Sequence, residues 1–331
     1  MNQQIIKEFN RLISQIKFDI TNNPSKKDKT INLYRLKQVQ NVLNIIKDYK
    51  KEIKNGKELA HIKGVGKGSV ARIDEILKTG TLSEITTTED QDKQLDIMDQ
   101  LTEIIGIGQV SAYEFVNKFG IKSADDLLKK YNEGEIELPH QIIMGLKYKD
   151  LVKKNIQRDE INQIKEFLIK EIFKIDTKLN LYICGSYRRN KQTSGDIDVL
   201  ITHPDIKTKS QLSNNTNYLM AFVDRLKKDK FILDDITNDQ YEVVYRGFCK
   251  YKDNPVRRID IKYVPYDSEA FALLHYTGSD VFNQRVREVA KNLGYKLNEY
   301  GLYKGFKSIK CDSEKCILEM LGFEYIEPQD R

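Results

Sequence analysis

Hydrophobic residues recur with a helical period in the first part of the chain. Apolar side chains return every three or four positions over Gln3–Lys78, which predicts amphipathic helices. The polar segment Thr21–Lys29, which contains a proline, predicts a loop between two of them. The polar run Thr86–Lys93 predicts a linker that closes this helical part, and further helices are expected to about Lys170.

The pattern changes period in the second half of the chain. β-branched and aromatic residues alternate or cluster there as they do in strands, over Leu181–Cys184, Ile197–Thr202, Tyr241–Phe248 and Arg258–Val264. The amphipathic segment Ser210–Lys230 predicts one helix between the second and third of these strands. The sequence therefore predicts an α+β fold, in which helices are followed by a mixed sheet and then by short strands and helices.

Composition narrows the class of protein. With 331 residues, of which 40% are hydrophobic, the chain can bury cores for two or more folded units. The net charge of +6 is compatible with a polyanionic partner. Apolar runs are too short for a membrane span and the first residues are polar, so we expect an intracellular protein without membrane contact. Four cysteines without a CxxC pair and four scattered histidines predict reduced thiols and no zinc site.

A short glycine motif occurs twice. Gly64 and Gly66 in the first copy align with Gly106 and Gly108 in the second, at an offset of 42 (106 minus 64), and each copy is followed by an amphipathic pattern. A tight turn into a helix N-terminus presents backbone N–H groups to an anion. One copy alone could serve only packing, whereas two copies can grip two stretches of phosphodiester, with Lys67 beside the first.

Three aspartates are the candidate catalytic centre. Asp196 and Asp198 lie at alternate positions of a predicted strand and so project from the same face, and Asp260 alternates in the same way with its apolar neighbours. Paired carboxylates need a cation between them, and Mg²⁺ is the obvious one. Asp-x-Asp alone is compatible with a solvated strand end. Following Gly185-Ser186, it matches a nucleotidyltransferase signature, in which two metals stabilise the attacking and leaving oxygens.

Together the motifs resemble the family X DNA polymerases, most closely the polymerase beta type, along nearly the whole chain. The resemblance rests on the two glycine turns, Gly185-Ser186 with Asp196 and Asp198, Arg257-Arg258-Ile259-Asp260, Thr277-Gly278-Ser279-Asp280 with Phe282-Asn283, and Asn298-Glu299-Tyr300. It implies a lyase-like helical domain at 1–85, a DNA-binding region at 94–155, a catalytic palm at 156–265 and a nucleotide-selection subdomain at 266–331. Each of the first two would carry one helix-hairpin-helix, and no BRCT module is expected before them.

The resemblance also implies roles for individual residues. Asp196 and Asp198 would bind both divalent ions, Mg²⁺ or in its place Mn²⁺, and Asp260 the catalytic one only. The residues that would contact the incoming nucleotide are Arg158, Ser186, Arg189, Ser194, Gly195, Tyr276, Gly278, Asp280 and Asn283. Those that would contact DNA are Gly64, Gly66, Lys67, Gly106, Gly108, Arg258 and Arg287. Carbonyls of Ala60, Ile62 and Val65, and of Thr102, Ile104 and Ile107, would bind a monovalent cation, Na⁺ or K⁺.

Two positions depart from the family pattern. Family members with 5′-deoxyribose phosphate lyase activity use a lysine where this chain has Arg72, and an arginine does not readily form a Schiff base. Lys67 or Lys63 would have to replace it, while Arg35 and His61, with Lys67, are weak candidates for binding a 5′-phosphate. His275 stands before Tyr276 where relatives carry an aromatic pair, which leaves discrimination against ribose open.

The resemblance therefore favours a template-directed, gap-filling DNA polymerase of base excision repair. The short connection from Asp234 to Val256 argues against a template-independent transferase, and the intact aspartates argue against a non-catalytic DNA-binding protein. Its partners would be gapped or primed duplex DNA, deoxynucleoside triphosphates and a ligase or a repair scaffold, and it would act as a monomer. A nuclear enzyme and a viral enzyme in the cytoplasm or the virion would look alike.

Overall fold

The computed structural model describes residues 2–22, 25–49, 51–86, 88–152, 155–214, 216–238 and 241–331. The chain forms two compact units, Met1–Leu138 and Pro139–Arg331. The division falls inside the range 94–155, and the four-part organisation stays a prediction. No helix among the described residues has the length and apolar character needed to cross a bilayer.

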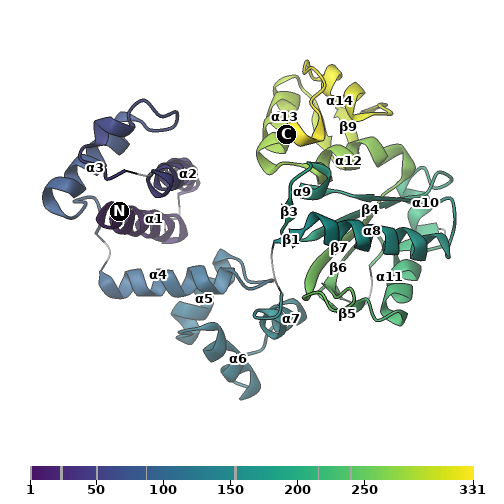
Figure 1. Ribbon diagram of the computed structural model, residues 1–331, viewed down its shortest axis with the longest axis horizontal. Helices are drawn as coiled ribbons and strands as arrows, with labels where there is room; N and C mark the ends of the chain where they lie inside the picture. The colour runs from purple at the N-terminus through teal and green to yellow at the C-terminus, as the bar shows by residue number, and fades with distance from the viewer. Residues whose placement is uncertain are drawn as a thin grey trace. The chain divides into compact units, whose positions relative to one another are not determined.

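The first unit is helical, as its period predicts. Its elements are α1 (Gln3–Asn22), α2 (Lys26–Asp48), the short 3₁₀ helix η1 (Gly56–Leu59), α3 (Lys67–Thr79), α4 (Glu89–Thr102), α5 (Gln109–Phe119) and α6 (Ala124–Asn132). The apolar faces of α1, α2 and α3 enclose one core, which includes Phe9, Leu12, Val42, Leu59 and Ile73. Helices α4 and α5 contact each other and are joined by the second glycine turn (Figure 1).

Two connections in this unit are shorter than predicted. The loop prediction Thr21–Lys29 is wrong at both ends. Helix α1 continues to Asn22, and α2 begins after Ser25, whose hydroxyl accepts a hydrogen bond from the Asp28 N–H. Positions 23 and 24 of the predicted loop lie outside the described residues. The linker prediction Thr86–Lys93 is wrong from Glu89 onward. There Thr88 and Gln91 form a reciprocal capping box that starts α4.

A five-stranded mixed sheet is the centre of the second unit. Its order is β2-β4-β7-β6-β5, with β4 and β7 parallel and the other neighbours antiparallel. The strands are β2 (Asn180–Ile183), β4 (Ile197–Thr202), β5 (Ile232–Asp235), β6 (Val244–Cys249) and β7 (Arg257–Tyr263). The predicted mixed sheet is confirmed, and of its five strands only the edge strand β5 was not predicted.

Helices cover both faces of this sheet. Helices α8 (Arg158–Phe173) and α11 (Tyr218–Lys228) pack on one face with Ile197, Val199 and Ile201 (Figure 1). On the other face Leu200 meets α12 (Glu269–Thr277). The predicted single helix Ser210–Lys230 is wrong, because α10 (Lys209–Asn214) ends before Asn217, whose side chain caps α11.

Short elements complete the second unit. Helix α7 (His140–Tyr148) precedes β1 (Ile156–Gln157). This strand pairs antiparallel with β3 (Thr193–Ser194), which follows the short helix α9 (Gly185–Arg188). The C-terminal part consists of η2 (Tyr266–Ser268), α12, α13 (Asp280–Asn292), β8 (Lys296–Asn298), β9 (Gly301–Lys304), β10 (Lys307–Ile309), α14 (Glu314–Met320) and η3 (Pro328–Asp330). The strands β8, β9 and β10 form an antiparallel meander, so this part mixes strands and helices as expected.

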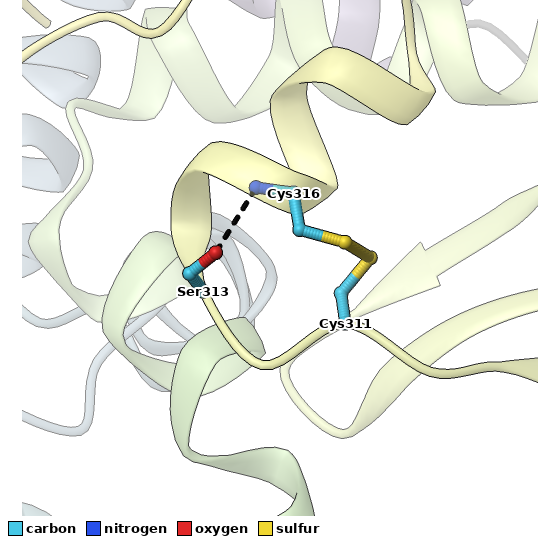
Figure 2. Close-up of a disulfide and its surroundings, with 3 residues drawn as sticks. All are labelled: Cys311, Ser313 and Cys316. Carbon is cyan, nitrogen blue, oxygen red and sulfur yellow. Dashed lines mark hydrogen bonds between the residues drawn. A yellow bond between two sulfur atoms is a disulfide. The ribbon is translucent and has the colours of Figure 1, made fainter.

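The prediction that all thiols are reduced is wrong for one pair. Cys311 and Cys316 form a disulfide across the start of α14, with their Cα atoms 5.5 Å apart (Figure 2). A turn between a strand and a helix brings positions five apart into bonding range, which a linear search for CxxC spacing cannot detect. Cys184 and Cys249 are free and buried, and burial raises the pKa of the Cys184 thiol to about 12.

Candidate active site

Two of the three candidate aspartates lie on neighbouring parallel strands, and the third immediately precedes one of them. Asp198 on β4 is in register with Asp260 on β7, and Asp196 lies one alternation before Asp198. Asp196 and Asp198 are half-buried, whereas Asp260 is only 7% exposed. The predicted placement on adjacent strands is therefore confirmed for Asp198 and Asp260, whereas Asp196 lies one residue before β4.

Basic side chains compensate these carboxylates. Arg258 donates to Asp196, and the Lys262 Nζ lies 2.7 Å from Asp198 Oδ1 and 3.8 Å from Asp260 Oδ2. Arg246 on β6, in register with Asp260, places its Nε 3.4 Å from Asp260 Oδ2. In the described ranges, no three acidic, histidine or cysteine side chains already form a metal-ligand set. The convergence of the three carboxylates on a metal stays a prediction.

The residues nevertheless fit a divalent cation. Asp260 Oδ1 is buried without a hydrogen-bond partner, as is Arg258 Nε, which lies 3.4 Å away. Burial raises the pKa of the Asp196 carboxyl and the charge of Asp198 raises it further, in spite of Arg258. Carboxylate oxygens are hard donors of the kind that Mg²⁺ and Mn²⁺ bind.

A glycine turn brings a second element against the carboxylates. Gly185 begins α9 with φ +55°, and a Cβ at this position would collide with the Asp198 carboxylate. The Cys184 N–H donates to the Asp198 carbonyl at 2.8 Å, which fixes the start of the turn. Glycine is needed here for the close approach, and Ser186 follows it directly in α9.

The other predicted nucleotide contacts gather at two places near α9. The Arg189 Nη1 donates to the Thr277 carbonyl and lies against Gly278, where an added Cβ would be 3.0 Å away. This contact brings the Gly185-Ser186 and Thr277-Gly278 segments together, and Asp280 begins α13 right after the second. Tyr276 lies close to the site as well, since the Lys262 Nζ is 4.9 Å from its ring centre.

The second group of predicted nucleotide contacts consists of Arg158, Ser194 and Gly195, near the Gly185-Ser186 turn. The Arg158 guanidinium donates to the Tyr187 carbonyl at 2.8 Å and lies 4.3 Å from the centre of the Tyr187 ring. Ser194 is buried in β3, and Gly195 is exposed with open space around it. In this conformation Arg158 therefore supports the turn through its carbonyls.

His275 joins two residues assigned to nucleotide and template contacts. The Asn283 side chain donates to the His275 carbonyl at 2.7 Å, and Arg287 Nη2 lies 2.9 Å from His275 Nδ1. Arginine can only donate, so Nδ1 accepts and the imidazole is neutral. Burial, and then the charge of Arg287, lower the pKa of His275, in keeping with that state.

The two glycine turns of the first unit have the same geometry. Gly64 and Gly106 have φ of +103° and +95°, and Gly66 and Gly108 are the N-caps of α3 and α5. Each turn is closed by the same hydrogen bond between residues three positions apart. The Val65 N–H donates to the Ile62 carbonyl and the Ile107 N–H to the Ile104 carbonyl, both at 3.1 Å. Carbonyls of Ala60 and Thr102 precede these turns. An added Cβ at Gly66 or Gly108 would meet nothing within 4 Å, so both helix starts are open to a partner.

Arg72 is engaged by a carboxylate that the sequence analysis did not single out. Arg72 donates through two nitrogens to Glu84, and the Arg35 Nη2 donates to Glu84 Oε2 at 2.6 Å. The hydrogen bond to Glu84 raises the pKa of Arg72. Lys63, Lys67 and His61 are exposed and lie outside this cluster.

Family models match four consecutive parts of the chain. They are a helix-hairpin-helix domain at residues 2–82, the fingers domain of DNA polymerase lambda at 99–151, the DNA polymerase beta palm at 155–266 and the DNA polymerase beta thumb at 272–331. DNA polymerase lambda of Arabidopsis thaliana is 31% identical over 92% of this chain. The chain belongs to the family X DNA polymerases.

Further relatives place this family X chain in the same group. DNA polymerase lambda of Rattus norvegicus is 29% identical over 87% of the chain, and DNA nucleotidylexotransferase of Xenopus laevis is 23% identical over 83%. The matches cover 60%, 51% and 59% of the plant, rat and frog proteins. The chain thus spans between half and three fifths of the length of these relatives. The aspartates lie in the palm, and Gly278, Asp280 and Arg287 lie in the thumb.

Proposed function

We propose that this chain is a template-directed DNA polymerase that adds deoxynucleotides to a primer 3′-hydroxyl at short gaps, as base excision repair requires. The observation that carries the proposal is the pairing of Asp198 with Asp260 across parallel strands, with Asp196 and the Gly185-Ser186 turn beside them. Membership of family X supports the reaction class. A nucleotidyltransferase needs this combination, because the carboxylates bind metal while the turn approaches the triphosphate.

The carboxylates would hold two divalent ions, Mg²⁺ or Mn²⁺. Asp196 and Asp198 would bind both ions and Asp260 one; when bound, they supply Lewis-acid stabilisation of the attacking and leaving oxygens. Asp260 would also take the proton of the primer 3′-hydroxyl. Arg258 and Lys262 would then release Asp196 and Asp198, and Arg258 would become available for the primer-terminal phosphate.

The nucleotide would bind between α9 and the Thr277-Gly278 segment. Ser186 and the Arg189 guanidinium would donate to the triphosphate, since charge-assisted donors suit phosphate oxygens. Arg189 Nε is buried without a partner, which leaves one donor of that fork unused. Arg158 would hold the turn in place through the Tyr187 carbonyl. Asp280, Asn283 and Tyr276 would contact the base and sugar, and Arg287 the template minor groove.

The two helix-hairpin-helix motifs would bind the DNA backbone on either side of the gap. Open helix starts at Gly66 and Gly108 supply N–H donors for phosphate, and the exposed Lys67 adds charge. A Na⁺ or K⁺ ion on the turn carbonyls would bridge to the same phosphates. A DNA ligase or a repair scaffold would be the partner after filling, with the enzyme acting as a monomer in the nucleus or, if viral, in the cytoplasm or virion.

Incorporation opposite each of the four template bases tests the proposal. With a one-nucleotide gap and Mg²⁺, the wild-type protein is expected to insert the complementary deoxynucleotide on every template and to extend a single-stranded primer negligibly. The measurement is single-turnover extension with each triphosphate in turn. Equal incorporation on gapped and single-stranded primers would instead support a template-independent transferase, and no incorporation on either would contradict the polymerase function.

A further inference from the structure

The disulfide between Cys311 and Cys316 in the thumb lies at the N-terminus of α14, which contacts the palm through Glu314. Cys311 follows β10, and Cys316 lies in the first turn of α14, where its N–H donates to the Ser313 side chain at 3.2 Å (Figure 2). The bond therefore closes a six-position loop, 311–316, and fixes the residues inside it. Glu314 is one of them, and it is only 7% exposed.

Glu314 connects this loop to the palm. Its carboxylate accepts two hydrogen bonds from Arg188, at 2.6 and 3.0 Å, and one from Arg331 at 2.6 Å. Burial opposes ionisation of Glu314, but the hydrogen bond from Arg188 and the charges of both arginines outweigh it and lower its pKa. The contact is thus a buried, charge-assisted pair whose strength depends on the position of Glu314.

Arg188 carries this connection to the nucleotide-binding segments. It is the last residue of α9, three positions after Gly185, and its Nη1 also donates to the Thr277 hydroxyl at 2.6 Å. Its neighbour Arg189 donates to the Thr277 carbonyl. The Glu314 carboxylate is therefore linked, through the Arg188 guanidinium, to both segments that would contact the triphosphate: α9 and Thr277-Gly278.

The disulfide is open to small reductants. Cys316 is half-buried, and Cys311 lines a cavity of about 350 Å³ whose other walls include Tyr266, Phe271, Tyr300 and Ile309. A dithiol in this cavity meets Cys311. Its thiolate attacks Cys311 Sγ to form a mixed disulfide while Cys316 leaves as the thiolate. The second thiol then closes the reductant ring and releases Cys311, so two electrons and two protons pass from the dithiol to the protein.

We propose that Cys311 and Cys316 form a reversible thiol–disulfide site whose oxidised state strengthens nucleotide binding by fixing Glu314 against Arg188. This inference rests on the proposed polymerase function, because the ligand it controls is the incoming triphosphate. Opening the loop frees Glu314, loosens Arg188 and relaxes both segments at Thr277. The catalytic carboxylates are not in this chain of contacts, so the effect falls on nucleotide affinity.

The test compares the purified protein before and after treatment with dithiothreitol, bound to gapped DNA. Alkylation followed by mass spectrometry is expected to label Cys311 and Cys316 only after reduction. Titration with a fluorescent deoxynucleoside triphosphate in the presence of Ca²⁺ is expected to show affinity lower by about fivefold or more in the reduced protein, the range of an ordinary coupling between two sites. Labelling of both cysteines without reduction, or equal affinity in both states, would overturn the proposal.

Three variants distinguish an effect through Glu314 and Arg188 from a general loss of folding stability. Cys316→Ser is expected to bind like the reduced wild type and to ignore dithiothreitol, while Cys249→Ala, a buried free thiol of β6, keeps the response. Glu314→Gln is expected to bind weakly in both states and to lose the response; a full response in this variant would contradict the route through Arg188. Single-turnover incorporation is measured in parallel. Redox-dependent affinity without incorporation would contradict the polymerase function and support the site, whereas incorporation with equal affinity would contradict the site alone.

Discussion

Asp260→Ala is expected to lower single-turnover incorporation at a one-nucleotide gap by about 10²–10⁴-fold, the effect of losing a positioned general base. Asp260 is the most buried of the three aspartates and is in register with Asp198, so its removal would also take away a proposed ligand of the catalytic metal. The affinity of the variant for gapped DNA should change little, because the proposed backbone contacts of the two glycine turns lie in another part of the chain. Extension is measured at saturating nucleotide and DNA.

Two controls make this result specific. Asp260→Asn keeps the volume of the side chain, so a loss of similar size would exclude collapse of β7 as its cause. Asp224→Ala removes an exposed carboxylate from α11 and is expected to leave incorporation unchanged. Incorporation by Asp260→Ala within a few fold of wild type would contradict the assignment of the catalytic site.

The wild-type protein is expected to give no covalent adduct when borohydride is added with a 5′-deoxyribose phosphate substrate. Arg72 occupies the position of the family lysine and is held by Glu84, and an arginine stays protonated and does not form a Schiff base readily. Lys67 and Lys63 are exposed and lie outside the cluster of Arg72, Glu84 and Arg35. The measurement is the yield of trapped protein–DNA adduct on a denaturing gel.

Variants of Arg72 and Glu84 test why no Schiff base is expected to form. Arg72→Lys alone is expected to trap poorly, because Glu84 would keep the new ammonium protonated. Arg72→Lys with Glu84→Gln is expected to trap at least about tenfold more, as removal of a close carboxylate lowers a lysine pKa by about a unit or more. Adduct formation by the wild type that disappears in Lys67→Ala would contradict this account and identify Lys67 as the nucleophile.

The catalytic face could be predicted because it depends on a local rule. Side chains alternate along a strand, so Asp196 and Asp198 had to share a face, and Asp260 had to oppose its apolar neighbours. The direct pairing of Asp198 with Asp260 depends on strand order and register. Register arises from packing across the whole sheet, as does the position of Arg246 on the neighbouring strand.

Errors in the predicted elements have local causes that the sequence did contain. Thr88 followed by Gln91 is a capping box, and Asn217 is a favoured cap, yet the polar runs around them were interpreted as linker and as helix. The contacts that could not be predicted join distant positions. Glu84 meets Arg35, and Glu314 meets Arg188, across separations of 49 and 126 positions. Such pairs form only once the helices have packed.

Anomalous diffraction from Mn²⁺ in crystals of the protein with gapped DNA and a non-hydrolysable deoxynucleoside triphosphate tests the central claim most directly. The account predicts two peaks, both within bonding distance of Asp196 and Asp198 and one of them also bonded to Asp260. It predicts as well that Arg258 has left Asp196. A single peak away from Asp260, or two peaks with neither contacting the three aspartates, would contradict a two-metal centre at this site.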